Sequence, residues 1–349
     1  MKSKNLSEKI LGSVRSQGFK YIELDSVIET SHIVQRSGEN FRKLIFSFND
    51  NSGKELCLRP DLTIASCLRY LKNNLKGKEK IFYSGEAYRK SPNIKDAIIR
   101  NQIGFEIIGS KNEKIDDREI INSAVKSLSK ITYLSGTLKI GNIEIFNLLI
   151  SKLDIPKRWK SRLLRHFSRK EYFNDLLDRL ETNSDVDPTV VKMDKKKYGR
   201  MVKESSKEIV AGRSIKEILG RFKNKINDPR KPSKGKKVSK IIKDFLKINC
   251  KIELAAAKLN HFFKKNQINL RVEKNYFPIS KNKISKLNVK FSTSFGRQLG
   301  YYTGMVFEID IKKKYKNINF INGGRYDKLI SDLGGKKKIP AVGAAFNLF

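Results

Sequence analysis

Asn101-Gln102-Ile103-Gly104-Phe105-Glu106-Ile107-Ile108-Gly109 alternates polar or small residues with large apolar ones. Because successive side chains of a β-strand point to opposite faces, this pattern predicts a strand with one polar face and one apolar face. A second β-like run, Ile81-Phe82-Tyr83-Ser84-Gly85-Glu86-Ala87-Tyr88, precedes it, and a polar loop separates the two. We therefore predict an antiparallel pair of strands joined by that loop.

Helical and β-like segments flank this pair on both sides. Asn5 and Glu8 form a capping box that predicts a first helix, with Gly18 as its C-terminal cap. The sequence predicts further strands at residues 21–24, 44–48, 55–58, 138–141, 270–272, 287–291, 305–311 and 318–321. The region between 146 and about 265 is instead helical in pattern and highly charged. Two β-rich blocks thus enclose one helical block.

The arrangement of these blocks predicts the fold class. Each β-rich block has too few strands to bury its apolar faces alone, so we expect both to contribute to one discontinuous sheet. The expected class is α+β. We expect the core to comprise residues 1–145 and 285–349, with a mainly helical, lysine-rich insertion at 146–284.

Composition indicates a cytoplasmic protein that needs no covalent or metal crosslinks. The 349 residues are 39% hydrophobic, enough to fill a sizeable core. Three cysteines and three histidines occur without CxxC spacing, so neither a disulfide framework nor a metal site is expected. Because no apolar run approaches the roughly 18 to 20 residues that span a bilayer, no membrane partner is expected.

The formal net charge of +38 has two interpretations. A strongly basic chain can bind nucleic acid through phosphate contacts, and residues 221–247 are the best candidate segment for an anionic contact. The charge is, however, mostly lysine spread over every segment, alongside abundant Asn, Ile, Phe and Tyr, which is typical of a genome rich in A and T. The second interpretation is preferred, so a nucleic-acid partner is not expected.

Several motifs, taken in order, resemble the catalytic core of the class II aminoacyl-tRNA synthetases, the histidyl enzymes in particular. They are Leu58-Arg59-Pro60-Asp61-Leu62-Thr63, Tyr88-Arg89 with 101–109, Arg297-Gln298-Leu299-Gly300-Tyr301-Tyr302-Thr303-Gly304, Gly323-Gly324-Arg325-Tyr326-Asp327, and Pro340-Ala341-Val342-Gly343. The resemblance covers residues 1 to about 145 and about 285 to 349. It implies a class II synthetase-like antiparallel sheet flanked by helices, with a helical insertion.

The same resemblance implies a site for free histidine. The ligand presents an ammonium, a carboxylate and an imidazole, so its pocket needs acids and amides, a cation and aromatic walls. By similarity, the ammonium would be held by Asp61, Gln102 and Glu106, with Thr63 beside them. Arg89 and Arg297 would hold the carboxylate, and Tyr301 and Tyr302 would line the imidazole pocket.

Ordinary structural roles remain open for these residues. Asp61 is equally placed to cap a helix running through Ala65 and Leu68. Gln102 and Glu106 fit the polar face of any strand, and paired tyrosines are common in cores. The order of the motifs, and no single residue, favours the binding site.

The chain departs from the synthetase pattern where ATP would be activated. Ile98 takes the place of the second motif 2 arginine, Gly300 takes the place of an aspartate, and Asp25 takes the place of the motif 1 proline. By the resemblance, a motif 3 arginine would follow Gly343, and we expect this chain to lack both that arginine and an anticodon-binding domain. Because losing one transition-state cation costs about two or three orders of magnitude in rate, we expect no adenylation, no catalytic residues and no cofactor.

Such a chain resembles the family of ATP phosphoribosyltransferase regulatory subunits, synthetase paralogues of histidine biosynthesis. The resemblance implies a non-catalytic subunit that binds histidine, activates a short-form catalytic subunit and transmits feedback inhibition. It also implies a homodimer within a hetero-oligomer. Two alternatives remain: a histidyl-tRNA synthetase-like enzyme or fragment, and an RNA-binding synthetase paralogue.

Overall fold

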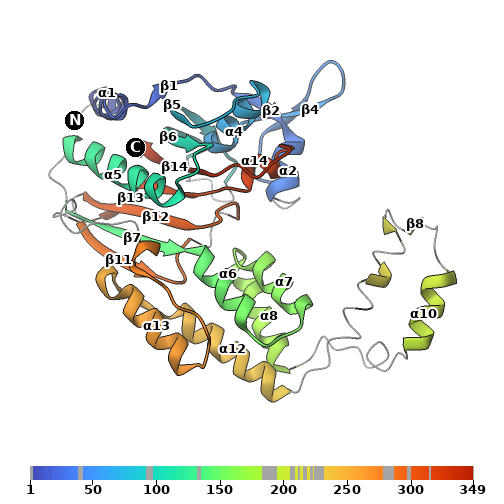
Figure 1. Ribbon diagram of the computed structural model, residues 1–349. Helices are drawn as coiled ribbons and strands as arrows, with labels where there is room; N and C mark the ends of the chain where they lie inside the picture. The colour runs from blue at the N-terminus through green and yellow to red at the C-terminus, as the bar shows by residue number, and fades with distance from the viewer. Residues whose placement is uncertain are drawn as a thin grey trace. The chain divides into compact units, whose positions relative to one another are not determined.

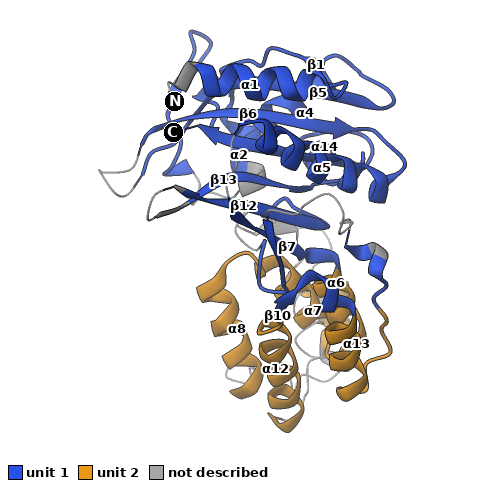
Figure 2. Cartoon of the chain, turned by 90° about the vertical axis from the view of Figure 1, so that its left-hand side faces the viewer, with its two compact units in different colours: residues 1–144, 249–256, 272–349 blue, residues 145–248, 257–271 orange. Residues whose placement is uncertain are grey.

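The structure is a computed structural model that describes residues 3–37, 42–91, 97–131, 135–182, 195–204, 209–210, 213–214, 218–220, 223, 232–277, 287–296, 300–313 and 316–348. The chain forms two compact units (Figure 2). Unit 1 comprises Met1–Glu144, Asn249–Ala256 and Val272–Phe349, and unit 2 comprises Ile145–Ile248 and Ala257–Arg271. The domain bounds at 145 and 285 stay a prediction. The compact units differ from them by placing residues 249–256 and those from 272 onward with unit 1.

Unit 1 is built on a nine-stranded sheet with the order β1-β5-β6-β14-β13-β12-β7-β11-β10. Its strands are β1 (Lys20–Tyr21), β5 (Glu79–Tyr88), β6 (Ile99–Ile108), β7 (Gly136–Asn142), β10 (Asn249–Lys251), β11 (Leu287–Ser292), β12 (Met305–Lys313), β13 (Lys316–Arg325) and β14 (Ala341–Leu348). A separate three-stranded sheet has the order β2-β4-β3, formed by β2 (Val27–Glu29), β3 (Ser47–Asn49) and β4 (Glu55–Leu58).

The two β-rich blocks of the sequence join in this sheet, as predicted. β14 pairs antiparallel with β6, with Gly343 opposite Glu106, and lies between β6 and β13 (Figure 1). The expected pair of β5 and β6 is also antiparallel. The sheet is mixed, however, because β1 is parallel to β5 and β11 is parallel to β7. The fold is class II synthetase-like α+β, with this amendment to the predicted antiparallel sheet.

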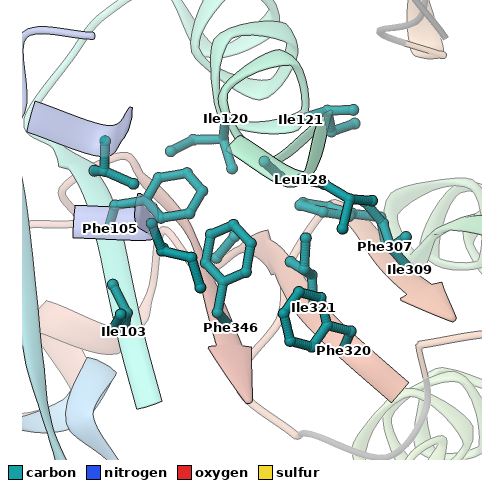
Figure 3. Close-up of a cluster of buried hydrophobic side chains, with 14 of the residues drawn as sticks. Ile103, Phe105, Ile120, Ile121, Leu128, Phe307, Ile309, Phe320, Ile321 and Phe346 are labelled. Atoms are coloured by element: carbon teal, nitrogen blue, oxygen red, sulfur yellow. The ribbon is translucent and has the colours of Figure 1, made fainter. Parts of the chain in front are cut away.

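One face of the sheet is apolar and is covered by two helices, α1 (Ser3–Arg15) and α5 (Glu113–Ile131). α1 ends before Gly18, whose φ of 83° lies in the left-handed region expected of a C-terminal cap. The side chains of this core come from alternate strand positions and from the inner face of α5. Figure 3 shows Ile103, Phe105, Ile120, Ile121, Leu128, Phe307, Ile309, Phe320, Ile321 and Phe346 packed together.

The opposite face of the sheet carries a second apolar cluster at its β5–β6 end. There α4 (Leu62–Lys72), α14 (Leu329–Asp332), α2 (Thr30–Ser37) and the small sheet contribute buried residues. The cluster also includes Tyr83 of β5, Tyr301 and Tyr326. Toward the β10 end this face carries polar side chains, such as Lys139, Lys290 and Glu308. The candidate site lies within the second cluster.

Unit 2 is mainly helical. Its described helices are α6 (Ile143–Lys152), α7 (Lys157–His166), α8 (Lys170–Thr182), α10 (Lys195–Glu204), α12 (Pro232–Leu246) and α13 (Ala255–Lys265). The first residues of α6 and α13 belong to unit 1. Two short strands, β8 (Ile209–Val210) and β9 (Arg213–Ser214), pair with each other. Phe146 stacks on Phe167 at 3.8 Å, and Trp159 is fully buried. Among the described residues, no helix has both the length and the apolar content to span a membrane.

One predicted strand is wrong. Residues 270–272 are irregular, and the structure instead has β10 at Asn249–Lys251, followed by η1 (Ile252–Leu254), with η2 at Lys274–Tyr276. A three-residue apolar–polar–apolar run carries too little pattern to define a strand.

Candidate functional site

Glu106 is the centre of a hydroxyl-lined cluster in unit 1. Its side chain lies on the β6 face opposite α1 and α5, and only 1% of its surface is exposed. Three hydroxyl groups donate hydrogen bonds to it: Thr63 at 3.1 Å and Tyr83 at 2.5 Å to Oε1, and Tyr326 at 2.6 Å to Oε2. Both carboxylate oxygens are thus held in one orientation.

Burial changes the acidity of this group. It raises the pKa of Glu106 to about 7, although the three donated hydrogen bonds act in the opposite direction. A carboxylate in such a site has a high free energy when ionised, because desolvation disfavours its charge. A cation brought next to it would relieve that cost. The site therefore suits an ammonium group better than a neutral or anionic one.

Glycines in the neighbouring strands leave room for this cluster. The ring of Tyr83 lies where a Cβ at Gly104 would be, at 2.3 Å from it. Gly343 of β14 lies opposite Glu106, and the Glu106 carboxylate occupies the space that a Cβ at residue 343 would need. A side chain at either glycine would displace a member of the cluster.

Asp61 begins α4 and also faces the tyrosines. Its carboxylate accepts the backbone N–H of Ile64 at 3.0 Å, which confirms the predicted helix cap. The other oxygen lies 3.4 Å from both Nη2 of Arg89 and the hydroxyl of Tyr301. The capping role and the proposed ligand role therefore use different oxygens of one side chain.

Arg89 is oriented by its own backbone contact. Its Nε donates to the carbonyl of Pro60 at 2.7 Å, which holds the guanidinium beside Asp61. A cation here supplies the counter-charge that a ligand carboxylate would need.

The two adjacent tyrosines pack edge to face. The rings of Tyr301 and Tyr302 are 4.9 Å apart at 61°, and Tyr301 meets Tyr326 at 6.1 Å and 85°. Burial, together with the nearby Asp61, raises the pKa of the Tyr301 and Tyr302 hydroxyls, so both stay protonated at neutral pH. They provide an aromatic wall with hydroxyl donors.

Gln102 has its hydrogen bond in another part of the sheet. The side-chain amide of Gln102 donates to the Asn347 side chain at 2.8 Å. This hydrogen bond holds the Gln102 amide against β14, and not against the hydroxyls around Glu106. Arg297 lies outside the described residues. Of the eight candidate residues, the geometry brings together Asp61, Thr63, Arg89, Glu106, Tyr301 and Tyr302.

Two members of the cluster were missed by sequence reasoning. Tyr83 and Tyr326 each donate to Glu106, yet neither was among the candidates. A signal for Tyr83 was available, because a glycine at 104 in the strand paired with it provides room for a large ring. Tyr326 belongs to the motif Gly323-Gly324-Arg325-Tyr326-Asp327, which was used only as part of the family resemblance.

A buried ion network supports the strand end that carries Tyr326. Arg325 donates to Asp117 at 2.8 Å, to Asp327 at 2.9 Å and to the carbonyl of Glu113 at 2.7 Å. Burial raises the pKa of Asp117 to about 6, although Arg325 acts in the opposite direction. The backbone of Asp327 also donates to Thr303 at 3.1 Å, which links this network to the segment that carries Tyr301 and Tyr302.

Comparison with known proteins agrees with this architecture. The sequence pattern described as histidyl-tRNA synthetase matches residues 1–349, and the chain belongs to this family. Its curated relatives include the ATP phosphoribosyltransferase regulatory subunits of Allorhizobium ampelinum and Brucella anthropi. The first is 27% identical, with 96% of this chain and 93% of the relative covered, and the second is 28% identical, with 92% and 89% covered.

Solved structures show the same fold. An ATP phosphoribosyltransferase regulatory subunit/histidyl-tRNA synthetase from Bacillus halodurans matches with a TM-score of 0.57 at 19% identity, covering 99% of this chain and 77% of that one. A histidine–tRNA ligase subunit from Alicyclobacillus acidocaldarius matches with a TM-score of 0.55 at 18% identity, covering 99% and 90%. At these identities the likeness concerns the fold alone.

Proposed function

We propose that this protein is a non-catalytic regulatory subunit of ATP phosphoribosyltransferase that binds free histidine at the Glu106 cluster. The observation that carries the proposal is the buried Glu106 carboxylate, held by three hydroxyls beside Asp61 and Arg89. An amino acid offers the ammonium that this carboxylate favours and the carboxylate that Arg89 favours. The names of the curated relatives support the regulatory role.

The proposed regulation acts through a partner. The subunit pairs with a short-form catalytic subunit, is required for its activity, and transmits inhibition by histidine. This coupling requires that histidine bind the inhibited and active assemblies with different affinities, because equal affinity shifts no equilibrium. We place the assembly in the cytoplasm and expect a homodimer within it.

Calorimetry with matched ligands tests the binding site. Histidine is titrated into the purified protein in parallel with histidinol, which lacks the carboxylate, and imidazolepropionate, which lacks the ammonium. Histidine should bind most tightly, and Glu106→Gln should weaken it at least about tenfold, since a buried charge-assisted contact is lost. Glu23→Gln, which removes an exposed carboxylate, is the matched control. Equal binding of histidine and imidazolepropionate would contradict the assignment of Glu106.

Activity measurements test the regulatory role separately. The short-form catalytic subunit should be active only with this protein present, and histidine should inhibit the mixture. The rival synthetase-like function predicts histidine-dependent ATP–pyrophosphate exchange by this protein alone. Exchange at a synthetase's rate would overturn the non-catalytic assignment.

A further inference from the structure

Three lysines form a row across the polar face of the large sheet, at its β10 end. Lys139 of β7 is the register partner of Lys290 in β11, and Lys290 is the register partner of Lys251 in β10. Register partners point to the same face, and neighbouring strands are about 4.8 Å apart. Like charges placed directly opposite each other destabilise a sheet. Where such lysines have no carboxylate beside them, an anion would relieve the repulsion.

Lys139, the first lysine of the row, has two counter-charges. The ammonium of Lys139 lies 2.7 Å from Glu308 and 3.0 Å from Asp310, both on β12. Within the part of the chain that the structure describes, neither Lys290 nor Lys251 is paired with a carboxylate, and both are exposed. Two positive charges thus remain available at the sheet edge.

A groove lies over these strands. Lys139, Asn249, Lys290, Ser292, Ser294 and Phe295 line it, and its volume is about 320 Å³. The hydroxyls of Ser292 and Ser294 are 3.0 Å apart and hydrogen-bond each other. None of the lining residues is acidic, and none belongs to the Glu106 cluster.

The lining chemistry identifies the ligand class. Ammonium, hydroxyl and amide donors together match the oxygens of a phosphate group, and the Phe295 ring offers an apolar wall for the group that carries it. The volume is at the lower end of the range for small-molecule sites. We propose that this groove binds a small phosphate monoester with a flat apolar group, independently of the Glu106 cluster. Its concave, small shape favours such a molecule over the backbone of a nucleic acid.

Calorimetry of the full chain tests this site with phenyl phosphate as the probe and phenol as its uncharged analogue. The titration is made at about 0.15 M salt, where exposed charges far from the probe are largely screened. Phenyl phosphate should bind saturably at one site, and phenol should not. Lys290→Gln should weaken phenyl phosphate at least about tenfold, because one charge-assisted contact is removed.

Two controls distinguish a specific binding site from non-specific attraction by the positive charge of the whole chain. Lys111→Gln removes an exposed lysine elsewhere in unit 1 and should change affinity less than about twofold. Thermal melting of Lys290→Gln should show an unchanged or higher melting temperature, because a like-charge pair is removed. The proposal is overturned by absence of saturable phenyl phosphate binding, or by equal weakening in Lys111→Gln. It is also overturned if a single-stranded RNA oligonucleotide binds, Lys290→Gln weakens that binding, and phenyl phosphate does not displace the RNA.

Discussion

The carboxylate of Glu106 occupies the space over Gly343 that any side chain at residue 343 would need. The two residues are register partners on β6 and β14, so the contact joins segments far apart in the sequence. Glu106 can turn toward Tyr326 only because its strand partner has no Cβ.

Gly343→Ala is therefore expected to push Glu106 from its hydroxyl donors. Overpacking of this kind costs about 1–3 kcal/mol in the free energy of unfolding. Urea denaturation measures it. The matched control is Gly12→Ala, which lies in α1 with nothing within 4 Å of the added Cβ and should be neutral or stabilising. Equal stability of the two variants would show that Glu106 relaxes without cost.

Stability should fall as pH rises from acid to neutral. The folded pKa values of Glu106, about 7, and Asp117, about 6, lie above their ordinary values of 4.5 and 3.8. The stability that each group contributes is fully present below its unfolded pKa and is lost as pH rises through its folded pKa. Between its unfolded and folded pKa values, each group lowers the free energy of unfolding by about 1 kcal/mol per pH unit.

Urea unfolding across about pH 4 to 8 checks this dependence. Glu106→Gln should remove the part of the slope that extends to about pH 7, while Asp117→Asn should remove the part that ends near pH 6. A wild-type slope that Glu106→Gln leaves unchanged would assign the titration to other groups.

Removing the Tyr326 hydroxyl should raise the pKa of Glu106 further, because its hydrogen bond favours the ionised carboxylate. The loss of stability in Tyr326→Phe should be about 1.5–3 kcal/mol above pH 7 and smaller in acid, where Glu106 is neutral. The control is Tyr88→Phe. The Tyr88 hydroxyl donates to the Glu86 carboxylate at 2.6 Å on a less buried part of the sheet. Its effect should stay below about 1 kcal/mol, because solvent screens that pair. Denaturation of both variants at two pH values decides between these outcomes.

Breaking the buried ion network should cost more than breaking an exposed pair. Arg325→Met leaves Asp117 and Asp327 without their cation, and such a loss typically costs about 3–5 kcal/mol. Lys72→Met, which removes the exposed pair with Asp25 at 3.5 Å, should cost less than about 1 kcal/mol. Thermal and urea unfolding compare them, and similar losses would contradict the inferred role of burial.

The sequence predicted those parts of the fold that depend on local periodicity. Ile103, Phe105 and Ile107 mark one face of β6, and that face does lie in the main core. β10 was missed because its three residues, Asn249–Lys251, are too few to carry a recognisable pattern and are mostly exposed. Its strand character comes from pairing with β11, which no local pattern reveals.

The candidate site was predictable only in part, for a similar reason. Asp61, Thr63, Arg89 and Glu106 came from short motifs, and they do lie together with Tyr301 and Tyr302. Tyr326 reaches Glu106 across 220 positions of sequence. A contact of that range depends on the completed sheet, so residue patterns alone did not identify it.

The central position of β14 has a consequence for synthesis. A nascent chain that lacks residues 341–348 holds two half-sheets, β1-β5-β6 and β13-β12-β7-β11-β10, with nothing to join them. The facing edges of β6 and β13 then carry unpaired backbone groups that other chains can capture. The sheet can therefore close only after residues 341–348 have been synthesised, and the slow step in folding this unit should be insertion of that strand.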